Sequence, residues 1–204
     1  MMRLKIGLDW DDVTAPFNSI AIQLANQKYN MNLSLEDITS WENTGRASVV
    51  KEFYGNLELY KKQSPSKDTI FWVRKLMDIA DVYFISAVST SFMSIRAEQI
   101  LNFFPELSPD KIILGSAKNL VHFDIVLDDN IYNLIDNPAD YKVLMRKPWN
   151  REMTGILSVR DIEEFYCLVT QICSLHKPVD VQRPYIISLV GPSGAGKNEL
   201  CRKL

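Results

Sequence analysis

The chain has 204 residues, of which 47% are hydrophobic and 24% are charged, and its formal net charge is −2. This length can bury one good core and leaves room for one inserted or appended subdomain. The near balance of charge offers no general attraction to nucleic acid, so we expect a small-molecule substrate rather than a nucleic-acid partner.

Apolar runs, cysteines and histidines exclude further classes of protein. No run of about eighteen apolar residues occurs, so no membrane span is expected. Acidic residues follow the start too closely for a secretory signal. The three cysteines lack paired metal-type spacing, which indicates reduced thiols and a cytoplasmic location. With only two histidines, neither a His-rich zinc site nor a Ser-His-Asp hydrolase is expected.

Short apolar runs alternate with helical patterns along most of the chain. Buried strands are predicted at Arg3–Leu8, Asp81–Ala87, Lys111–Leu114, Phe123–Leu127 and Tyr141–Met145. Helices are predicted at Phe17–Asn30, Asp68–Ile79, Ser91–Phe104 and Val159–Ser174. This alternation predicts an α/β fold, with a Rossmann-like parallel sheet and helices on both faces.

A segment of different character follows the first strand. Residues 15–66 lack strand alternation and contain helical spacing, which predicts a small helical insert. Within it, Ser34 can cap a short helix, with Asp37 three residues further on. We therefore predict two domains, at residues 1–178, which include the insert, and at residues 183–204.

Polar side chains follow the predicted strands at the points where those strands end. They are Asp9 and Asp11, Ser86, Lys118, and the pair Asp128 and Asp129. Ligands of open parallel sheets bind beyond the carboxyl ends of the strands. Each group alone has an ordinary structural explanation: a solvated loop, a structural hydroxyl, a solvent-facing lysine and a turn. Their shared position after successive strands favours one common site.

Phosphoryl transfer needs this set of groups. Of two carboxylates spaced by two residues, one can attack phosphorus while the other manages the proton of the leaving group. A hydroxyl such as Ser86 and a cation such as Lys118 can hold phosphate oxygens. Asp128 and Asp129 offer the hard oxygen ligands that Mg²⁺ prefers.

These motifs resemble the haloacid-dehalogenase (HAD) phosphatase superfamily. DWDDV at residues 9–13 is similar to its DxDx[TV] element, FIS at 84–86 to its strand-end Ser/Thr, and LDD at 127–129 to its acidic pair. The resemblance covers roughly residues 1–175. It implies that Asp9 forms an aspartyl-phosphate and that Asp11 is the general acid/base. It also implies that Ser86 and Lys118 hold the phosphate, and that Mg²⁺ is held by Asp9, the Asp11 carbonyl, and Asp128 or Asp129.

The insert resembles a C1-type cap, and two segments resemble the 5′(3′)-deoxyribonucleotidase group. They are YNMNLSLEDITSWEN and LMRKPWNRE. This resemblance implies a nucleotide substrate and a possible homodimer. It assigns Phe17, eight positions after Asp9, to the nucleobase pocket, and Trp41 is a second candidate for stacking. Packing between cap and core is the alternative for both aromatic residues. Ala87 and Asn130 depart from the usual pattern and leave the substrate open.

A second phosphate-binding motif lies near the end of the sequence. Gly191, Gly196 and Lys197 fit the P-loop pattern GxxxxGK after a predicted strand, Tyr185–Val190. The chain ends at Leu204, too soon for a complete kinase. We therefore expect residues 183–204 to resemble the start of a truncated P-loop segment that is not functional as a kinase in this chain.

The leading hypothesis is a Mg²⁺-dependent phosphatase that hydrolyses (deoxy)ribonucleoside monophosphates through an aspartyl-phosphate. One alternative is the phosphatase part of a polynucleotide kinase-phosphatase acting on nucleic-acid 3′ ends, because such proteins combine the two motifs. A helical cap argues against it, since a cap restricts the access of a polymer end. Another is a regulatory nucleotide-binding module, which the complete set of acids makes the weakest of the three. The base, the sugar and the position of the phosphate remain open.

Overall fold

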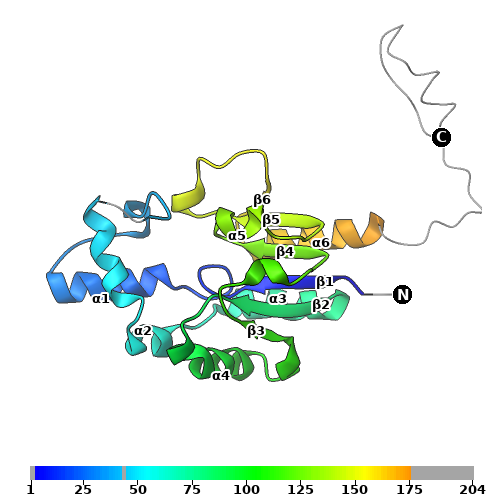
Figure 1. Cartoon of the computed structure of the whole chain (residues 1–204), viewed down its shortest axis with the longest axis horizontal. Helices are drawn as coiled ribbons and strands as arrows, with labels where there is room; N and C mark the ends of the chain where they lie inside the picture. Colours follow the sequence, from blue (N-terminus) through cyan, green and yellow to red (C-terminus); the bar gives the residue numbers. More distant parts are fainter. Residues whose placement is uncertain (1–2, 43–44, 176–204) are drawn as a thin grey trace, which may run out of the picture. The chain divides into compact units, whose positions relative to one another are not determined.

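The computed structural model describes residues 3–42 and 45–175. Within these residues six parallel strands form one sheet in the order β3-β2-β1-β4-β5-β6 (Figure 1). The strands are β1 (Lys5–Asp9), β2 (Asp81–Ser86), β3 (Ile112–Leu114), β4 (Ile125–Asp128), β5 (Tyr141–Met145) and β6 (Leu157–Val159). The predicted α/β class with a parallel sheet is confirmed.

Six α-helices and six 3₁₀-helices accompany the strands in the described part of the chain. The α-helices are α1 (Asn18–Tyr29), α2 (Leu57–Lys62), α3 (Lys67–Ile79), α4 (Met93–Phe103), α5 (Ile131–Ile135) and α6 (Ile162–Leu175). The 3₁₀-helices are η1 (Leu35–Asp37), η2 (Gly45–Phe53), η3 (Thr90–Phe92), η4 (Pro109–Lys111), η5 (Lys118–Leu120) and η6 (Pro148–Asn150). None of these helices combines the length and the apolar character that a membrane crossing requires.

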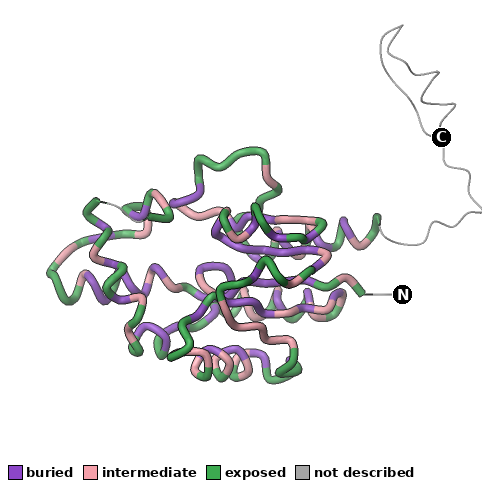
Figure 2. Tube along the Cα trace, viewed as in Figure 1, coloured by how far each residue is buried: buried purple, intermediate pink, exposed green. Residues whose placement is uncertain are grey.

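The sheet is buried by helices on both of its faces. Ile6 and Leu8 of β1 belong to a large apolar cluster that also contains side chains of α3, α4 and α6. The opposite face packs Val126 and Leu144 against Leu134 of α5 in a smaller cluster. Figure 2 shows the resulting band of buried residues along the strands. Two covered faces explain why the strands appear in the sequence as continuous apolar runs rather than as alternating ones.

The sixth strand corrects the sequence prediction at the end of the sheet. Val159, predicted to begin a helix, is the last residue of β6 and pairs in parallel with Met145 of β5. The helix α6 begins three residues later, at Ile162. A strand of three residues, of which only Val159 is buried, is too short to show a period, so its pairing with β5 decides its conformation.

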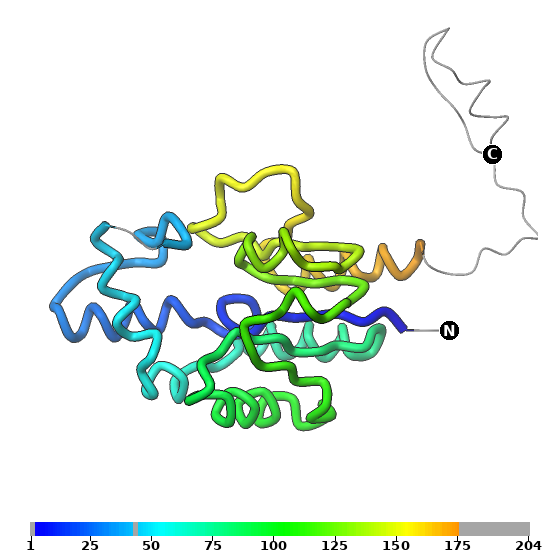
Figure 3. The backbone as a smooth tube through the Cα atoms, in the orientation of Figure 1, coloured from blue at the N-terminus to red at the C-terminus, as the bar shows by residue number. Residues whose placement is uncertain are grey.

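The helices α1, η1, η2 and α2 form a separate layer, which we call the helical segment (residues 18–62). Figure 3 shows that this segment lies beyond the carboxyl ends of β1 and β2, after which the chain returns to the sheet through α3. The segment has its own buried cluster, which includes Leu24, Val50 and Leu59. Trp149, from the loop after β5, packs into the same cluster and ties the segment to the sheet.

The P-loop prediction concerns residues that the structure does not describe. The predicted strand Tyr185–Val190 and the loop residues Gly191, Gly196 and Lys197 all lie outside the described ranges.

Candidate active site

The carboxylates of Asp9, Asp128 and Asp129 meet at the carboxyl edge of the sheet. Asp9 is the last residue of β1 and Asp128 the last of β4, and these strands pair in register up to Leu8 and Leu127. Each of the three acids offers an oxygen, and these oxygens all lie within 4.8 Å of one another. All three side chains are buried. Strand pairing therefore brings together acids that are far apart in the sequence.

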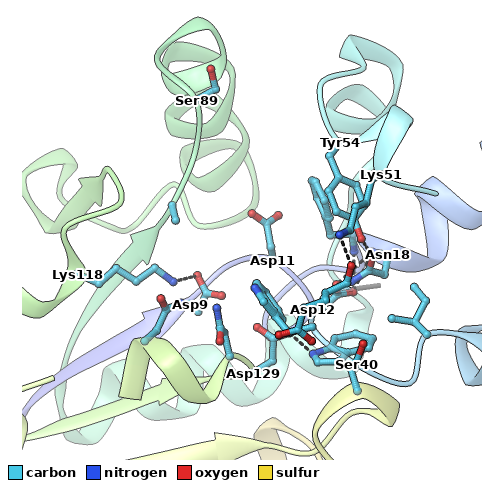
Figure 4. Close-up of a pocket in the computed structure, with 18 of the residues that line it drawn as sticks. Asp9, Asp11, Asp12, Asn18, Ser40, Lys51, Tyr54, Ser89, Lys118 and Asp129 are labelled. Atoms are coloured by element: carbon cyan, nitrogen blue, oxygen red, sulfur yellow. Dashed lines mark hydrogen bonds and ion pairs between the residues drawn. The ribbon is translucent and has the colours of Figure 1, made fainter. Parts of the chain in front are cut away.

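Lys118 lies between two of these acids. Its Nζ is 2.7 Å from Asp9 Oδ1 and 2.7 Å from Asp128 Oδ2, and Figure 4 shows the pair with Asp9. Asp128 is held from the other side by the backbone N–H of Asn130, at 2.9 Å, and by the amide of Asn133, at 3.0 Å. The carboxylates are thus fixed by donors from two segments, η5 and the start of α5.

Burial dominates the protonation of Asp9 and Asp129. It raises the pKa of Asp9 to about 8, against the opposing attraction of Lys118. Burial, followed by the charge of Asp128, also raises the pKa of Asp129 well above its ordinary value. Burial acts to lower the pKa of Lys118, but the charges of Asp9 and Asp128 outweigh it and raise that pKa. Three oxygen donors in so little space, with one lysine as counter-charge, fit a hard divalent cation such as Mg²⁺.

The loop after β1 leaves the strand pleat through a tight turn. Asp12 has φ 56°, a left-handed conformation that Asp tolerates better than most residues. Its N–H donates to the Ala15 carbonyl at 2.8 Å, and the Thr14 hydroxyl donates to the Asp9 carbonyl at 2.6 Å. Because the turn breaks the strand alternation, the adjacent residues Asp11 and Asp12 both line the same cavity as Asp9.

Asp11 is held by two residues that the sequence analysis did not single out. Gln63 Nε2 donates to Asp11 Oδ1 at 2.6 Å, and Arg96 Nη2 donates to Asp11 Oδ2 at 3.1 Å. Arg96 has one sequence signal, because it precedes the buried Ile100 by four residues and so lies on the apolar face of α4. Gln63 has none, since it only follows the last turn of α2.

Ser86 ends β2 beside β1. Its Oγ is fully buried and has no hydrogen-bond partner among the described residues. A buried hydroxyl without a partner carries the cost of its lost hydration, so an anion that accepts its hydrogen bond would be favoured there. Ala87 and Ser89 line the cavity described below, whereas Ser86 directly precedes Ala87 in the chain and is not one of the lining residues.

A cavity of ≈ 590 Å³ opens over the acids, within the usual range for small-molecule sites. Asp9, Asp11, Lys118 and Asp129 line it on the sheet side, and aromatic residues line it on the side of the helical segment. Phe17 lines the cavity and packs against Tyr54, with ring centroids 5.2 Å apart. Trp41 also lines it, 46% exposed and outside the buried clusters. Phe17 thus packs against a neighbouring ring and also faces the cavity, whereas Trp41 is exposed and is not a core residue.

Asp12 connects the loop after β1 to the helical segment, a role that the sequence analysis missed. Its carboxylate accepts hydrogen bonds from the backbone N–H groups of Phe17 and Asn18, and from Asn18 Nδ2 at 2.7 Å. Tyr54 then donates to Asn18 Oδ1 at 2.6 Å. Burial raises the pKa of Asp12 to about 6, although the Phe17 N–H opposes it. The loop and the start of α1 are therefore joined by one hydrogen-bond network.

Comparisons with curated proteins give relatives over the same part of the chain. A 5′(3′)-deoxyribonucleotidase of Bacillus subtilis (strain 168) is 25% identical over 167 residues, which cover 80% of this chain and 96% of the relative. A 5′(3′)-deoxyribonucleotidase of Clostridium acetobutylicum is 26% identical over 166 residues, covering 79% of this chain and 92% of the relative.

Solved structures confirm the fold. A haloacid dehalogenase-like hydrolase from Burkholderia xenovorans superposes with a TM-score of 0.56 at 10% identity, over 84% of this chain and 98% of that one. The HAD-hydrolase YfnB of Bacillus subtilis, solved bound to magnesium, has a TM-score of 0.51 at 14% identity, over 83% of this chain and 100% of that one. The fold of the described chain is HAD-like.

A family model assigns the chain more closely. The description of that family is 5′ nucleotidase, deoxy (pyrimidine), cytosolic type C protein (NT5C), and its model matches residues 3–174. The resemblance to deoxyribonucleotidases found in the sequence is thereby confirmed, while the match does not reach the glycine-rich segment with Lys197. Over residues 3–174, the chain belongs to the deoxy (pyrimidine) cytosolic type C 5′-nucleotidase family.

Proposed function

We propose that this protein is a Mg²⁺-dependent phosphatase that hydrolyses deoxynucleoside monophosphates, with Asp9 as the nucleophile. The observation that carries the proposal is the position of Asp9, which shares the Lys118 ammonium with Asp128 beneath a cavity with aromatic walls. Two relatives that carry the name 5′(3′)-deoxyribonucleotidase, and that the match covers over 96% and 92% of their length, support the choice of substrate class.

Two half-reactions follow from this assignment. In the first, a carboxylate oxygen of Asp9 attacks phosphorus, the bond between phosphorus and the nucleoside oxygen breaks, and Asp11 gives a proton to that oxygen. In the second, water attacks phosphorus of the aspartyl-phosphate and gives a proton to Asp11. The bond from phosphorus to the Asp9 oxygen then breaks, which releases phosphate and restores both carboxyl groups.

Phosphate oxygens are held by the groups around Asp9. Lys118 Nζ is already 2.7 Å from Asp9 Oδ1, so a phosphate approaching that oxygen comes within reach of the ammonium. The Ser86 hydroxyl gains the acceptor that it lacks in the described structure. Positive charge and donors around the equatorial oxygens are what phosphoryl transfer requires.

The acid cluster supplies the proposed metal site. Asp9, Asp129 and the backbone carbonyl of Asp11 would hold Mg²⁺, with Asp128 as a further ligand or as the support of Lys118. When bound, the cation supplies the positive charge that lets an anionic carboxylate approach an anionic phosphate. Asp129 is oriented for this task by Trp149, whose Nε1 donates to Asp129 Oδ2 at 3.0 Å.

The nucleoside is assigned to the side of the cavity formed by the helical segment. Phe17 and Trp41 offer aromatic surfaces for a base, and we propose that residues 15–66 act as a cap on a catalytic domain of residues 1–178. The free thiol of Cys167 agrees with a cytoplasmic location. A homodimer remains a prediction, which sedimentation of the purified chain tests.

Phosphate release from deoxynucleoside monophosphates, with Mg²⁺ and with a chelator, tests the proposal. We expect turnover only with Mg²⁺, and a loss of at least about 10³-fold in Asp9→Asn with an unchanged circular dichroism spectrum. Asp81→Asn is the matched control, because Asp81 is the first residue of β2 and lies at the amino ends of the strands, away from the candidate site. Turnover of a 3′-phosphorylated oligonucleotide in preference to mononucleotides would support the end-repair alternative instead.

A further inference from the structure

Asp11 is contacted from two sides by residues far away in the sequence. Gln63 follows the last helix of the helical segment, whereas Arg96 belongs to α4 on the sheet. Arg96 Nη2 lies 2.8 Å from Asp11 Oδ1 and 3.1 Å from Oδ2, and Gln63 Nε2 lies 2.6 Å from Oδ1. Both carboxylate oxygens are therefore restrained, although the side chain of Asp11 is still 24% exposed.

The position of Arg96 is itself fixed by burial. Its side chain is fully buried, and its guanidinium lies 5.8 Å from the ring centroid of Trp10 and 5.3 Å from that of Tyr60. A buried charge needs a partner of opposite charge, and Asp11 is the carboxylate that pairs with Arg96. Because the aromatic rings leave the guanidinium little freedom, it sets the place of the Asp11 carboxylate.

Gln63 contributes a second restraint from the helical segment. The residue is 2% exposed, and its Oε1 is buried without a partner in the described structure. Burial of this amide group without a full set of partners lowers the stability of the fold. The hydrogen bond that its Nε2 donates to Asp11 offsets part of that loss. A leucine would fill the same space without that cost. The polar side chain thus points to a role at Asp11 rather than to packing.

We infer that Arg96 and Gln63 are positioning residues, which hold Asp11 where it exchanges a proton with the leaving nucleoside oxygen. The inference rests on the proposed phosphatase function. In an in-line displacement the nucleophile and the leaving oxygen lie on opposite sides of phosphorus. Figure 4 shows the Asp11 carboxylate turned away from the pair of Lys118 and Asp9, as this division of roles requires.

The contacts of Asp11 are compatible with proton transfer. A carboxylate has about four lone-pair positions, and the two hydrogen bonds from Gln63 and Arg96 leave others free for a proton. General acid catalysis depends on geometry within hydrogen-bond reach of the leaving oxygen, so the loss of either restraint should lower its efficiency.

A comparison of two leaving groups tests the inference. A deoxynucleoside monophosphate expels an alkoxide that needs a proton, whereas p-nitrophenyl phosphate expels a phenolate that does not. We expect Arg96→Met and Gln63→Leu to lower kcat/KM for the nucleotide about 10- to 100-fold more than for the aryl ester. Asp11→Asn should show the same preferential loss to a greater extent. Arg96→Lys, which keeps the charge, should recover part of the loss.

Gln99→Leu is the matched control. Gln99 lies one turn after Arg96 on α4 and its amide donates to the Tyr60 carbonyl, not to Asp11. This variant should change kcat/KM for both substrates by the same factor. The inference would be overturned if Arg96→Met and Gln63→Leu lowered kcat/KM equally for both substrates while Asp11→Asn lowered it more for the nucleotide. If Arg96→Met does not fold, Gln63→Leu decides alone.

The same experiment separates this inference from the proposed function. A wild-type protein that hydrolyses neither ester would refute both. Activity on both esters, with no preferential loss in Asp11→Asn, would leave a phosphatase in which Asp11 is not the proton donor, and the roles of Arg96 and Gln63 would be refuted alone.

Discussion

Lys118 balances the charge of the buried acids. Its side chain is 5% exposed, and those of its partners Asp9 and Asp128 are 6% and 1% exposed. Charges interact strongly where water is excluded, so two carboxylates at this spacing would repel each other without the ammonium. Even with Lys118 present, burial keeps the pKa of Asp9 near 8. The site is therefore short of positive charge, which is the condition that a metal ion or a proton relieves.

We predict that the substitution Lys118→Met lowers both the stability of the protein and its activity. Removal of one partner from a buried ion pair leaves uncompensated charge, so the free energy of unfolding without Mg²⁺ should fall by about 3 kcal/mol. Denaturation in urea measures this change. Lys111→Met is the control, because the ion pair of Lys111 with Asp81 is partly exposed and should contribute less than about 1 kcal/mol. Equal losses in the two variants would contradict the prediction.

Among the secondary-structure elements, β1 determines where the proposed nucleophile Asp9 lies. Ile6 and Leu8 point into the large cluster, while Gly7 faces the other side of the sheet against Phe123. A Cβ on Gly7 would lie 2.7 Å from the Phe123 ring, and Phe123 is itself buried. A side chain at position 7, two residues before Asp9, would therefore clash with this ring, so the position requires a glycine.

We predict that Gly7→Ala destabilises the protein by about 1–3 kcal/mol, because overpacking in a close-packed core forces neighbouring side chains to move. Thermal denaturation measures the effect. The double variant Gly7→Ala with Phe123→Leu should recover part of the loss. Gly55→Ala is the control, since no heavy atom lies within 4 Å of a Cβ built there, and its effect should stay within about 0.5 kcal/mol. A Gly7→Ala protein as stable as the control would show that β1 can shift.

The loop after β1 and the helix α1 are also joined by hydrogen bonds. Asp12 binds the first backbone N–H groups of α1, and Asn18 passes the connection on to Tyr54 of the helical segment. Arg96 and Gln63 add a second connection, from α4 and from the end of α2 to Asp11. The proposed acid/base thus lies between two sets of contacts that relate the helical segment to the sheet.

For the whole molecule, the acid cluster links stability to pH and to Mg²⁺. The pKa of Asp9 rises from an ordinary 3.8 to about 8 in the folded chain, and that of Asp129 is raised as well. A carboxyl group with a raised folded-state pKa contributes stability below its unfolded pKa, and this contribution is lost as the pH rises through the folded-state value. Without a metal, the cluster should therefore destabilise the protein progressively between about pH 4 and about pH 8.

We predict that the rise in Tm caused by saturating Mg²⁺ is larger at about pH 8 than at about pH 6. Protons compete with the cation for the same carboxylates, and binding to the folded state alone raises Tm. Thermal melts at the two pH values, each with Mg²⁺ and with chelator, measure the difference. Asp9→Asn should reduce both the rise and its dependence on pH. A rise that is equal at both pH values would contradict the involvement of these acids.

Local sequence patterns were enough to predict the fold class and the polar groups that meet at the candidate site. Apolar runs and helical periods are local patterns, and they predicted five of the six strands of the described sheet. Parallel strands bring their carboxyl ends to one edge, so the chain positions of Asp9, Lys118 and Asp128 were enough to predict that they converge. The strand β6 was missed because three residues show no period and pairing with β5 decides their state.

The residues that support the candidate site are specified by contacts between distant elements. Gln63 is 52 residues from Asp11 and Arg96 is 85 residues from it, so no local pattern relates them. The connection from Asp12 through Asn18 to Tyr54 likewise depends on a left-handed turn and on the packing of η2 against α1. Periodicity specifies which face of an element is buried, whereas the partner of a buried polar group is specified only when distant elements pack together.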